Sequence, residues 1–170
     1  MLKIINDLEP FFKDCYRRIS VREYSRLSKI SPPTASKLLE GYKKEGLLNG
    51  FQERNFNYYY ANKENKAFVE LSRIFWQNIL DESGMLTEIE RQFINPVVIL
   101  FGSLSKAEAK SDSDMDIAVF ASSKKKTNLE RFEKALGRKI QLFIFSRMQD
   151  VKSNELLNNI LNGYKLIGSW

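Results

Sequence analysis

Histidine is absent from the 170-residue sequence, and this absence excludes several classes of enzyme chemistry. Without an imidazole there is no Ser-His-Asp triad, no histidine general base and no histidine-ligated zinc site. A metal ion bound by this chain would therefore need oxygen ligands, which suit Mg²⁺ or Mn²⁺.

Cysteine and long apolar stretches are also scarce. Cys15 is the single cysteine, so no disulfide can form within the chain, and a reducing compartment suits it. The longest apolar run, at residues 96–101, is far shorter than the roughly 20 residues of a membrane-spanning helix. The N-terminal residues carry acids early and lack a small-residue cleavage site, so no secretory signal is expected. We therefore expect a cytoplasmic protein with no membrane partner.

Positive charge exceeds negative charge, and the net charge is +6. Residues 1–66 and 96–170 are basic, whereas the connecting residues 67–95 are acidic. A basic N-terminal segment is compatible with nucleic acid, because lysine and arginine displace counterions from phosphates. The sequence is 43% hydrophobic and 12% aromatic, so it can fill a folded core rather than remain disordered.

The most informative segment begins at the apolar run 97–101, which predicts a buried strand. The strand breaks at Gly102-Ser103, a turn whose N–H groups and hydroxyl can hold a phosphate. Asp114 and Asp116 follow, separated and flanked by apolar residues. Alternate residues of a strand share a face, so both carboxylates are expected on one face and the apolar residues on the other. Paired carboxylates are best tolerated where a divalent cation neutralises them.

This pattern resembles the signature of the polymerase β-type nucleotidyltransferase superfamily, in particular its minimal branch. The matching positions are Gly102, Ser103, Asp112, Ser113, Asp114 and Asp116, and the resemblance extends over roughly residues 85–170. It implies that Asp114 and Asp116 are catalytic and bind Mg²⁺ or Mn²⁺. It also implies that Gly102 and Ser103 bind a nucleoside triphosphate, with Lys106 and Lys110 as candidates to neutralise its phosphates.

Ser105 and Ala107 replace a small residue and a glycine of the family pattern, and one further departure matters more. Gln141 stands where the resemblance leads us to expect a third carboxylate on a later strand, at residues 139–145. An amide has no charge and cannot act as a base near neutral pH, so catalysis should suffer more than nucleotide binding. Glu133 and Asp150 are nearby acids, but nothing in their spacing favours either as a substitute. Whether the protein is an enzyme therefore stays open.

Residues 20–61 predict two short helices followed by a strand pair, with a polar turn at residues 52–57 between the strands. Ser20 with Glu23 forms a capping-box pattern, and Ser31 before two prolines is a favourable helix start. The order resembles a winged helix-turn-helix of the multiple-antibiotic-resistance repressor family, which implies double-stranded DNA as a partner. The alternative is that this segment is a protein-interaction module that does not bind DNA. The residues that the resemblance assigns to DNA are Pro33, Thr34, Ser36, Lys37, Lys43, Lys44, Arg54 and Asn55.

Further elements complete the predicted α+β fold. Amphipathic helices are expected at residues 2–18 and 64–80, either as dimerising arms or as packing elements. Tyr58–Tyr60 is expected to serve core and sheet packing, with base stacking as the alternative. Residues 122–127 predict a basic loop, and helices at 128–136 and 154–162 are expected to cover one face of the sheet. We place the domain break after residue 82. The prediction is a winged helix-turn-helix module at 1–82 and a nucleotidyltransferase-like domain, with a mixed sheet covered by helices, at 83–170.

These features lead to one main functional hypothesis and two alternatives. The first is a Mg²⁺-dependent enzyme that transfers a nucleoside monophosphate to a protein or RNA hydroxyl and is coupled to DNA binding. The second is a transcriptional regulator with weakened catalysis that senses a nucleotide or a partner. The third is an antitoxin-like protein that acts on a separate protein partner.

Overall fold

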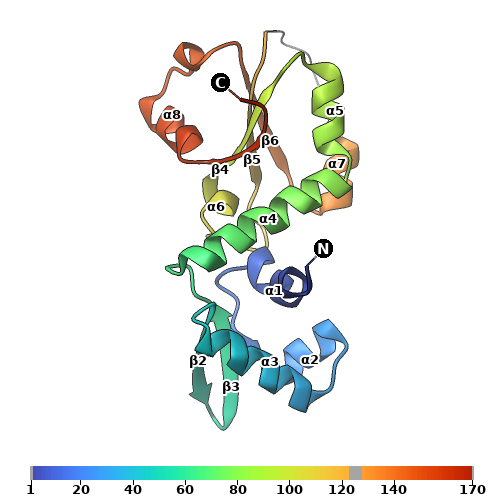
Figure 1. The fold of residues 1–170 in the computed structure, drawn as a ribbon, viewed down its shortest axis with the longest axis vertical. Coiled ribbons are helices and arrows are strands. Elements are labelled where there is room, and N and C mark those ends of the chain that lie inside the picture. Colours follow the sequence, from blue (N-terminus) through green and yellow to red (C-terminus); the bar gives the residue numbers. More distant parts are fainter. Residues whose placement is uncertain (1, 123–127, 170) are drawn as a thin grey trace. The chain divides into compact units, whose positions relative to one another are not determined.

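The computed structural model describes residues 2–122 and 128–169 (Figure 1). The chain divides into two compact units, each treated separately below. The first contains residues up to 72 together with 107–111, and the second contains 73–106 and the residues from 112 onward. The predicted break after residue 82 lies at the C-terminal end of helix α4, whereas the two units divide within this helix. In the described parts of the chain, no helix combines the length and apolar character needed to cross a membrane.

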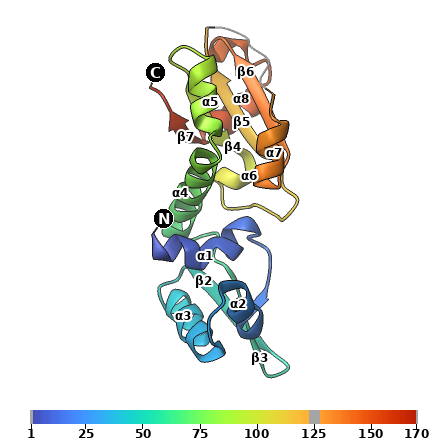
Figure 2. The same ribbon diagram turned by 90° about the vertical axis from the view of Figure 1, so that its right-hand side faces the viewer.

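The N-terminal unit consists of helices followed by a hairpin, and a short third strand completes its sheet (Figure 2). Its elements in chain order are α1 (Lys3–Lys13), β1 (Ile19–Ser20), α2 (Val21–Ser28), α3 (Pro32–Lys44), β2 (Leu48–Glu53), β3 (Phe56–Ala61) and the start of α4 (Lys66–Glu82). The sheet is antiparallel in the order β1-β3-β2. Strand β1 is only two residues long and was not predicted from the sequence.

Side-chain caps explain where α2 and α3 begin. The Ser20 hydroxyl accepts the backbone N–H of Glu23, and the Ser31 hydroxyl accepts that of Thr34. Only one half of the predicted capping box is used in this way, because the Glu23 carboxylate pairs with the guanidinium of Arg17. Each cap satisfies an N–H group that has no partner within its helix.

The hairpin turn is tighter than the polar turn predicted over residues 52–57. Strands β2 and β3 pair up to Glu53 and Phe56, so only Arg54 and Asn55 form the loop. Both residues have positive φ, at 45° and 64°, as a two-residue type I′ turn requires. The outer residues of the predicted turn are therefore paired strand residues.

Helix α1 supplies much of the N-terminal core through Ile5, Leu8, Phe11 and Phe12, all of which are buried. It is shorter than the predicted helix over residues 2–18 and ends at Lys13. After an extended Asp14, the buried Cys15 donates its backbone N–H to the carbonyl of Ala109 at 2.8 Å. A distant segment of the chain thus takes the place of a further helical turn.

The C-terminal unit is built around a four-stranded mixed sheet in the order β6-β5-β4-β7. Its elements are the rest of α4, α5 (Met85–Gln92), β4 (Val97–Phe101), α6 (Gly102–Ser105), β5 (Met115–Phe120), α7 (Glu130–Leu136), β6 (Ile140–Phe145), a 3₁₀ turn (Met148–Asp150), α8 (Asn154–Leu161) and β7 (Tyr164–Ile167). Strands β5 and β6 are parallel, while β4 is antiparallel to both β5 and β7. The predicted mixed sheet covered by helices is present.

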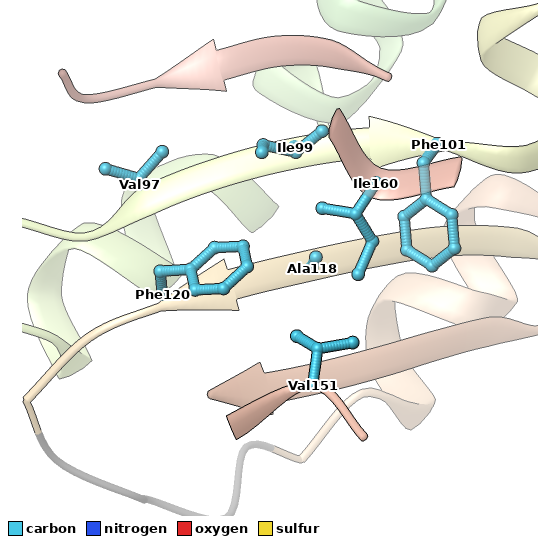
Figure 3. Close-up of a cluster of buried hydrophobic side chains, with 7 residues drawn as sticks. All are labelled: Val97, Ile99, Phe101, Ala118, Phe120, Val151 and Ile160. Carbon is cyan, nitrogen blue, oxygen red and sulfur yellow. The ribbon is translucent and has the colours of Figure 1, made fainter. Parts of the chain in front are cut away.

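Both faces of this sheet are apolar and covered. On one face the buried side chains pack with Val151 and with Ile160 of α8 (Figure 3). The sheet residues of this cluster are Val97, Ile99, Phe101, Ala118 and Phe120. Helices α5 and α7 lie on the opposite face, where Arg131 of α7 pairs with Glu88 of α5 (Figures 1 and 2). The prediction that the helices at 128–136 and 154–162 cover the same face is therefore wrong.

The structure does not test two of the sequence predictions, the basic loop and the dimer seam. The basic loop predicted at 122–127 lies, apart from Ser122, outside the described residues. In α4, Phe75 and Trp76 are buried, whereas Ile74 is exposed. A dimer seam along this helix stays a prediction.

Candidate functional site

The first part of the candidate site is the turn where β4 ends and the single-turn helix α6 begins. Gly102 has a φ of +72°, and a Cβ atom at this position would lie 2.3 Å from Oδ2 of Asp116. Only glycine permits both this backbone conformation and this close approach of a carboxylate. The buried Ser105 hydroxyl donates to the Gly102 carbonyl at 2.9 Å and closes the turn. Ser103 lies between them and is half-buried.

Strand β5 places the second part of the site. Asp116 pairs in register with Phe101 of β4 and with Gln141 of β6, so one line of residues crosses three strands. Met115 and Ile117, on the other face of β5, are fully buried. The alternation predicted from the sequence is therefore present. One difference is that the face of β5 that carries Asp116 is itself buried from Ala118 onward.

Asp114 and Asp116 influence each other electrostatically. Burial raises the pKa of Asp116 above its usual range, and the negative charge of Asp114 raises it further. Both causes act in the same direction, because each disfavours the charged carboxylate. A cation close to both groups would relieve this unfavourable arrangement.

Gln141 lies where the strand register puts the third position of the site. Its side-chain Nε2 donates a hydrogen bond to Oδ2 of Asp114 at 2.7 Å. The amide therefore contacts Asp114 directly and supplies a hydrogen-bond donor where the resemblance leads us to expect a carboxylate. Its carbonyl oxygen remains a potential ligand, but without charge.

Neither alternative acid replaces the missing carboxylate. Glu133 accepts the backbone N–H of Ile140 at 3.0 Å, and this bond lowers its pKa, although the nearby charge of Asp114 acts in the opposite direction. Asp150 pairs with Arg147 at 3.3 Å. Within residues 2–122 and 128–169, no three acidic or cysteine side chains are grouped so that they could hold a metal ion.

The two lysines predicted to bind phosphate have different surroundings. The Lys106 ammonium group donates to the side-chain oxygen of Asn159 on α8 at 3.0 Å. Lys110 belongs to the segment that packs with the N-terminal unit, and its ammonium group lies 5.6 Å from the centre of the Tyr16 ring. Lys106 is therefore held within the unit that contains the carboxylates, whereas Lys110 and Tyr16 both belong to the first unit.

One residue that positions the acidic segment was not found from the sequence. Arg138, just before β6, donates to the backbone carbonyl of Ser113 at 2.6 Å, and its guanidinium lies 5.0 Å from the Trp76 ring centre. It thereby fixes the backbone directly before Asp114. No local signal marks Arg138, because its partners lie 25 and 62 positions away in the sequence.

The residues predicted to contact DNA lie on the surface of the N-terminal unit. Ser36 is half-buried, and the others are exposed: Pro33, Thr34, Lys37, Lys43, Lys44, Arg54 and Asn55. Four of these residues lie in the N-terminal half of α3: Pro33, Thr34, Ser36 and Lys37. Lys43 and Lys44 lie in the last turn of this helix. Arg54 and Asn55 form the hairpin tip.

Comparison with known proteins agrees with this geometry for the C-terminal part of the chain. Residues 86–169 match the family described as polymerase beta, nucleotidyltransferase, which identifies a nucleotidyltransferase domain there. Strand β4, the Gly102 turn, both aspartates and Gln141 all lie within the match. Neither a curated protein nor a solved structure matches the chain.

The donor atoms at this site suit a hard divalent cation. Asp114 and Asp116 offer carboxylate oxygens, and Gln141 offers an amide oxygen. Oxygen ligands of this kind are those that Mg²⁺ prefers, and substrate phosphates commonly complete its coordination. The two carboxylates and the amide therefore offer oxygen ligands of the type that suits a divalent cation.

Proposed function

We propose that the C-terminal domain binds a nucleoside triphosphate with Mg²⁺, or Mn²⁺, and transfers its monophosphate to a hydroxyl group of a protein or RNA. The observation that carries this proposal is the contact of the Asp116 carboxylate with the turn at Gly102. This contact brings a metal-binding group to the turn whose backbone and Ser103 hydroxyl would hold the phosphates. The family match of residues 86–169 supports the same class of reaction.

The proposed reaction follows from these groups. An acceptor hydroxyl oxygen forms a bond to the α-phosphorus, the bond from this phosphorus to the bridging oxygen breaks, and pyrophosphate leaves. The hydroxyl proton passes to solvent, since Gln141 cannot accept it. Asp114 and Asp116 would hold a metal ion, which would supply charge stabilisation to the phosphates. Lys106, held by Asn159, adds positive charge from the same unit.

Calorimetric titration with ATP and with GTP, in the presence and absence of Mg²⁺, tests nucleotide binding. We expect metal-dependent binding in the wild type and its loss in Asp114→Asn/Asp116→Asn. Asp81→Asn removes an exposed acid from α4 and should bind as the wild type does. Binding that persists without metal or in the double variant would contradict the proposal. Transfer itself is tested by incorporation of labelled AMP or GMP into acceptors in a lysate of the source cells.

We further propose that residues 1–82 form a winged helix-turn-helix that binds double-stranded DNA and is coupled to the domain at 83–170. The support is the order of a capped α2, a capped α3 and a two-residue hairpin. The exposed N-terminal half of α3 would enter the major groove, and Arg54 at the hairpin tip would contact the backbone or minor groove. Exposure of nearly all the assigned residues is compatible with this role.

The salt dependence of duplex binding tests this part of the proposal. Each lost phosphate contact reduces the slope of log affinity against log salt by about 0.9. Lys37→Ala with Arg54→Ala should therefore weaken duplex binding and reduce this slope. Lys134→Ala, an exposed change in α7, is the control for loss of charge. An unchanged slope in the double variant would contradict duplex binding by this face.

The hydrogen bond between Gln141 and Asp114 favours a second candidate, a regulator that binds nucleotide without transferring it. Nucleotide binding that requires both aspartates, combined with no label transfer to any acceptor, would favour this candidate. An antitoxin-like role toward a protein partner is a third possibility for the same domain. A homodimer through α1 and α4 and a cytoplasmic location also stay predictions.

A further inference from the structure

The sheet of the N-terminal unit has one face that the functions proposed above do not use. Tyr59 is buried on the helix-facing side, and its hydroxyl donates to Glu40 of α3 at 2.9 Å. Tyr58 and Tyr60, its neighbours in β3, point to the opposite side because strand side chains alternate. Both are only partly buried. The prediction that Tyr58–Tyr60 serves sheet packing is thus met by the middle residue, which leaves the other two on the outer sheet face.

Four aromatic rings lie on this outer sheet face: Phe51, Phe56, Tyr58 and Tyr60. Phe51 stacks on Tyr58 with ring centres 5.5 Å apart and planes 17° from parallel, and it lies 6.2 Å from Tyr60. Phe56, next to the hairpin tip, is 44% exposed. From Tyr60 to Phe56 the strand advances about 13 Å, so the rings form a stripe rather than a single contact.

Cations accompany the rings on this face and beside it. The guanidinium of Arg18 lies 5.1 Å from the Phe51 ring centre, and that of Arg22 lies 5.5 Å from Phe56. Lys63 lies 4.0 Å from the centre of the Tyr16 ring, which is 48% exposed. An aromatic ring attracts a cation but carries no net charge, so these pairs leave the positive charge available to an anion.

A groove joins the two groups of rings. Tyr16, Arg18, Phe51, Tyr60 and Lys63 all line it, together with Cys15, Asn49, Ala61, Asn62 and Glu64. It therefore combines aromatic surfaces, two positive charges and amide groups, and Glu64 adds a single negative charge to the lining. Flat rings next to cations and hydrogen-bonding amides match a base attached to a phosphate.

We propose that the outer sheet face binds single-stranded nucleic acid, with bases stacked on Phe51 and Tyr60 in the groove and phosphates close to Arg18 and Lys63. Bases are accessible to such rings only when they are not already stacked within a duplex. The stripe continues past the groove through Tyr58 to Phe56 and Arg22, which suits several consecutive nucleotides better than one free nucleotide. Its residues differ from those of α3 proposed to bind duplex DNA, and they belong to the first unit, whereas Asp114 and Asp116 belong to the second.

The test measures fluorescence anisotropy of the full-length protein with labelled dT12, U12 and a 12-base-pair duplex at the same salt concentration. We expect Phe51→Leu/Tyr60→Leu, which keeps apolar side chains but removes both rings, to weaken single-strand binding about tenfold or more. Lys63→Ala should also weaken it, whereas Glu64→Gln should tighten it about twofold through the loss of a repelling charge. Lys37→Ala, on α3 and away from the stripe, should leave single-strand binding unchanged.

Photocrosslinking of the wild type with dT12 containing 4-thiothymidine locates the contact independently of any variant's folding. Crosslinks at Phe51, Tyr60 or their neighbouring strand residues would support the proposal. Absence of single-strand binding, equal weakening of duplex and single-strand binding by Lys37→Ala, or crosslinks confined to α3, Arg54 and Asn55 would overturn it. Competition by free AMP as effective as by dT12 would overturn the assignment of a strand and indicate a mononucleotide pocket.

Discussion

Replacing Gln141 with aspartate tests the geometry of the carboxylate site most directly. The variant loses the 2.7 Å hydrogen bond from the Gln141 amide to Asp114, which contributes about 1 kcal/mol at this exposed position. It also places a third negative charge beside two others, which at short range near the surface costs roughly 1–2 kcal/mol. Without metal we therefore expect the free energy of unfolding to fall by roughly 2–3 kcal/mol. For a chain of this length, this corresponds to a melting temperature lower by roughly 5–10 °C.

Magnesium should reverse this loss. An ion that binds only the folded state at 100 times its dissociation constant stabilises that state by about 2.7 kcal/mol, which is comparable to the deficit. Thermal melts across a Mg²⁺ titration should therefore show a larger stabilisation for Gln141→Asp than for the wild type. The labelled-nucleotide assay should show increased transfer if the missing carboxylate limits catalysis.

The matched control is Gln52→Asp, which makes the same substitution at an exposed strand residue of the other unit. It should lose little stability and gain none specifically from Mg²⁺. If Gln141→Asp and Gln52→Asp respond to Mg²⁺ equally, Gln141 does not lie at a metal site. That result would refute the reasoning from strand register.

Three further outcomes are expected. Gly102→Ala should lose Mg²⁺-dependent nucleotide binding in calorimetry, because its Cβ would collide with Asp116. The control is Gly84→Ala, at a residue with a similar φ of +75° and no neighbour within 4 Å of the added Cβ. It should bind nucleotide normally despite about 1–2 kcal/mol of backbone strain. Asp116→Asn should stabilise the protein at neutral pH and progressively less in acid. Burial, and to a lesser extent the charge of Asp114, raises the pKa of Asp116 in the folded protein. The wild type therefore loses stability as pH rises from about 3.8 through the folded-state pKa of Asp116, and the Asn variant does not. Urea unfolding of both proteins at several pH values checks this pH dependence. Ser31→Ala should cost about 1 kcal/mol in the same unfolding assay, because it removes the N-cap of α3.

Elements governed by local chemistry were predicted well. The alternation around Asp116 predicted a strand with one buried face, and the serines before α2 and α3 predicted helix starts that the structure has. The length of α1 was not predictable, since the chain turns at Asp14 to make a backbone hydrogen bond with Ala109. Nothing within residues 2–18 encodes a partner so far along the sequence.

The placement of α7 and α8 shows a second limit of sequence patterns. Amphipathicity predicts that each helix covers apolar surface, but it does not specify which face of the sheet. Helix α7 connects the neighbouring parallel strands β5 and β6, whereas α8 lies on the path from β6 at one edge to β7 at the other. The two connections pass over opposite faces, and only the strand order makes this visible (Figures 1 and 2).

The carboxylate site depends both on local sequence pattern and on strand pairing between distant segments. Residue types along one short segment predicted a glycine turn and two carboxylates, but their contact depends on the pairing of Phe101 with Asp116 across β4 and β5. The parallel pairing of β5 and β6 then brings Gln141 into the same line. Because this residue can donate a hydrogen bond to Asp114 but adds no charge, the site retains two like charges. The arrangement therefore suits the proposed binding of a cation with a polyphosphate better than the proposed deprotonation of an acceptor hydroxyl, to which Gln141 would contribute nothing.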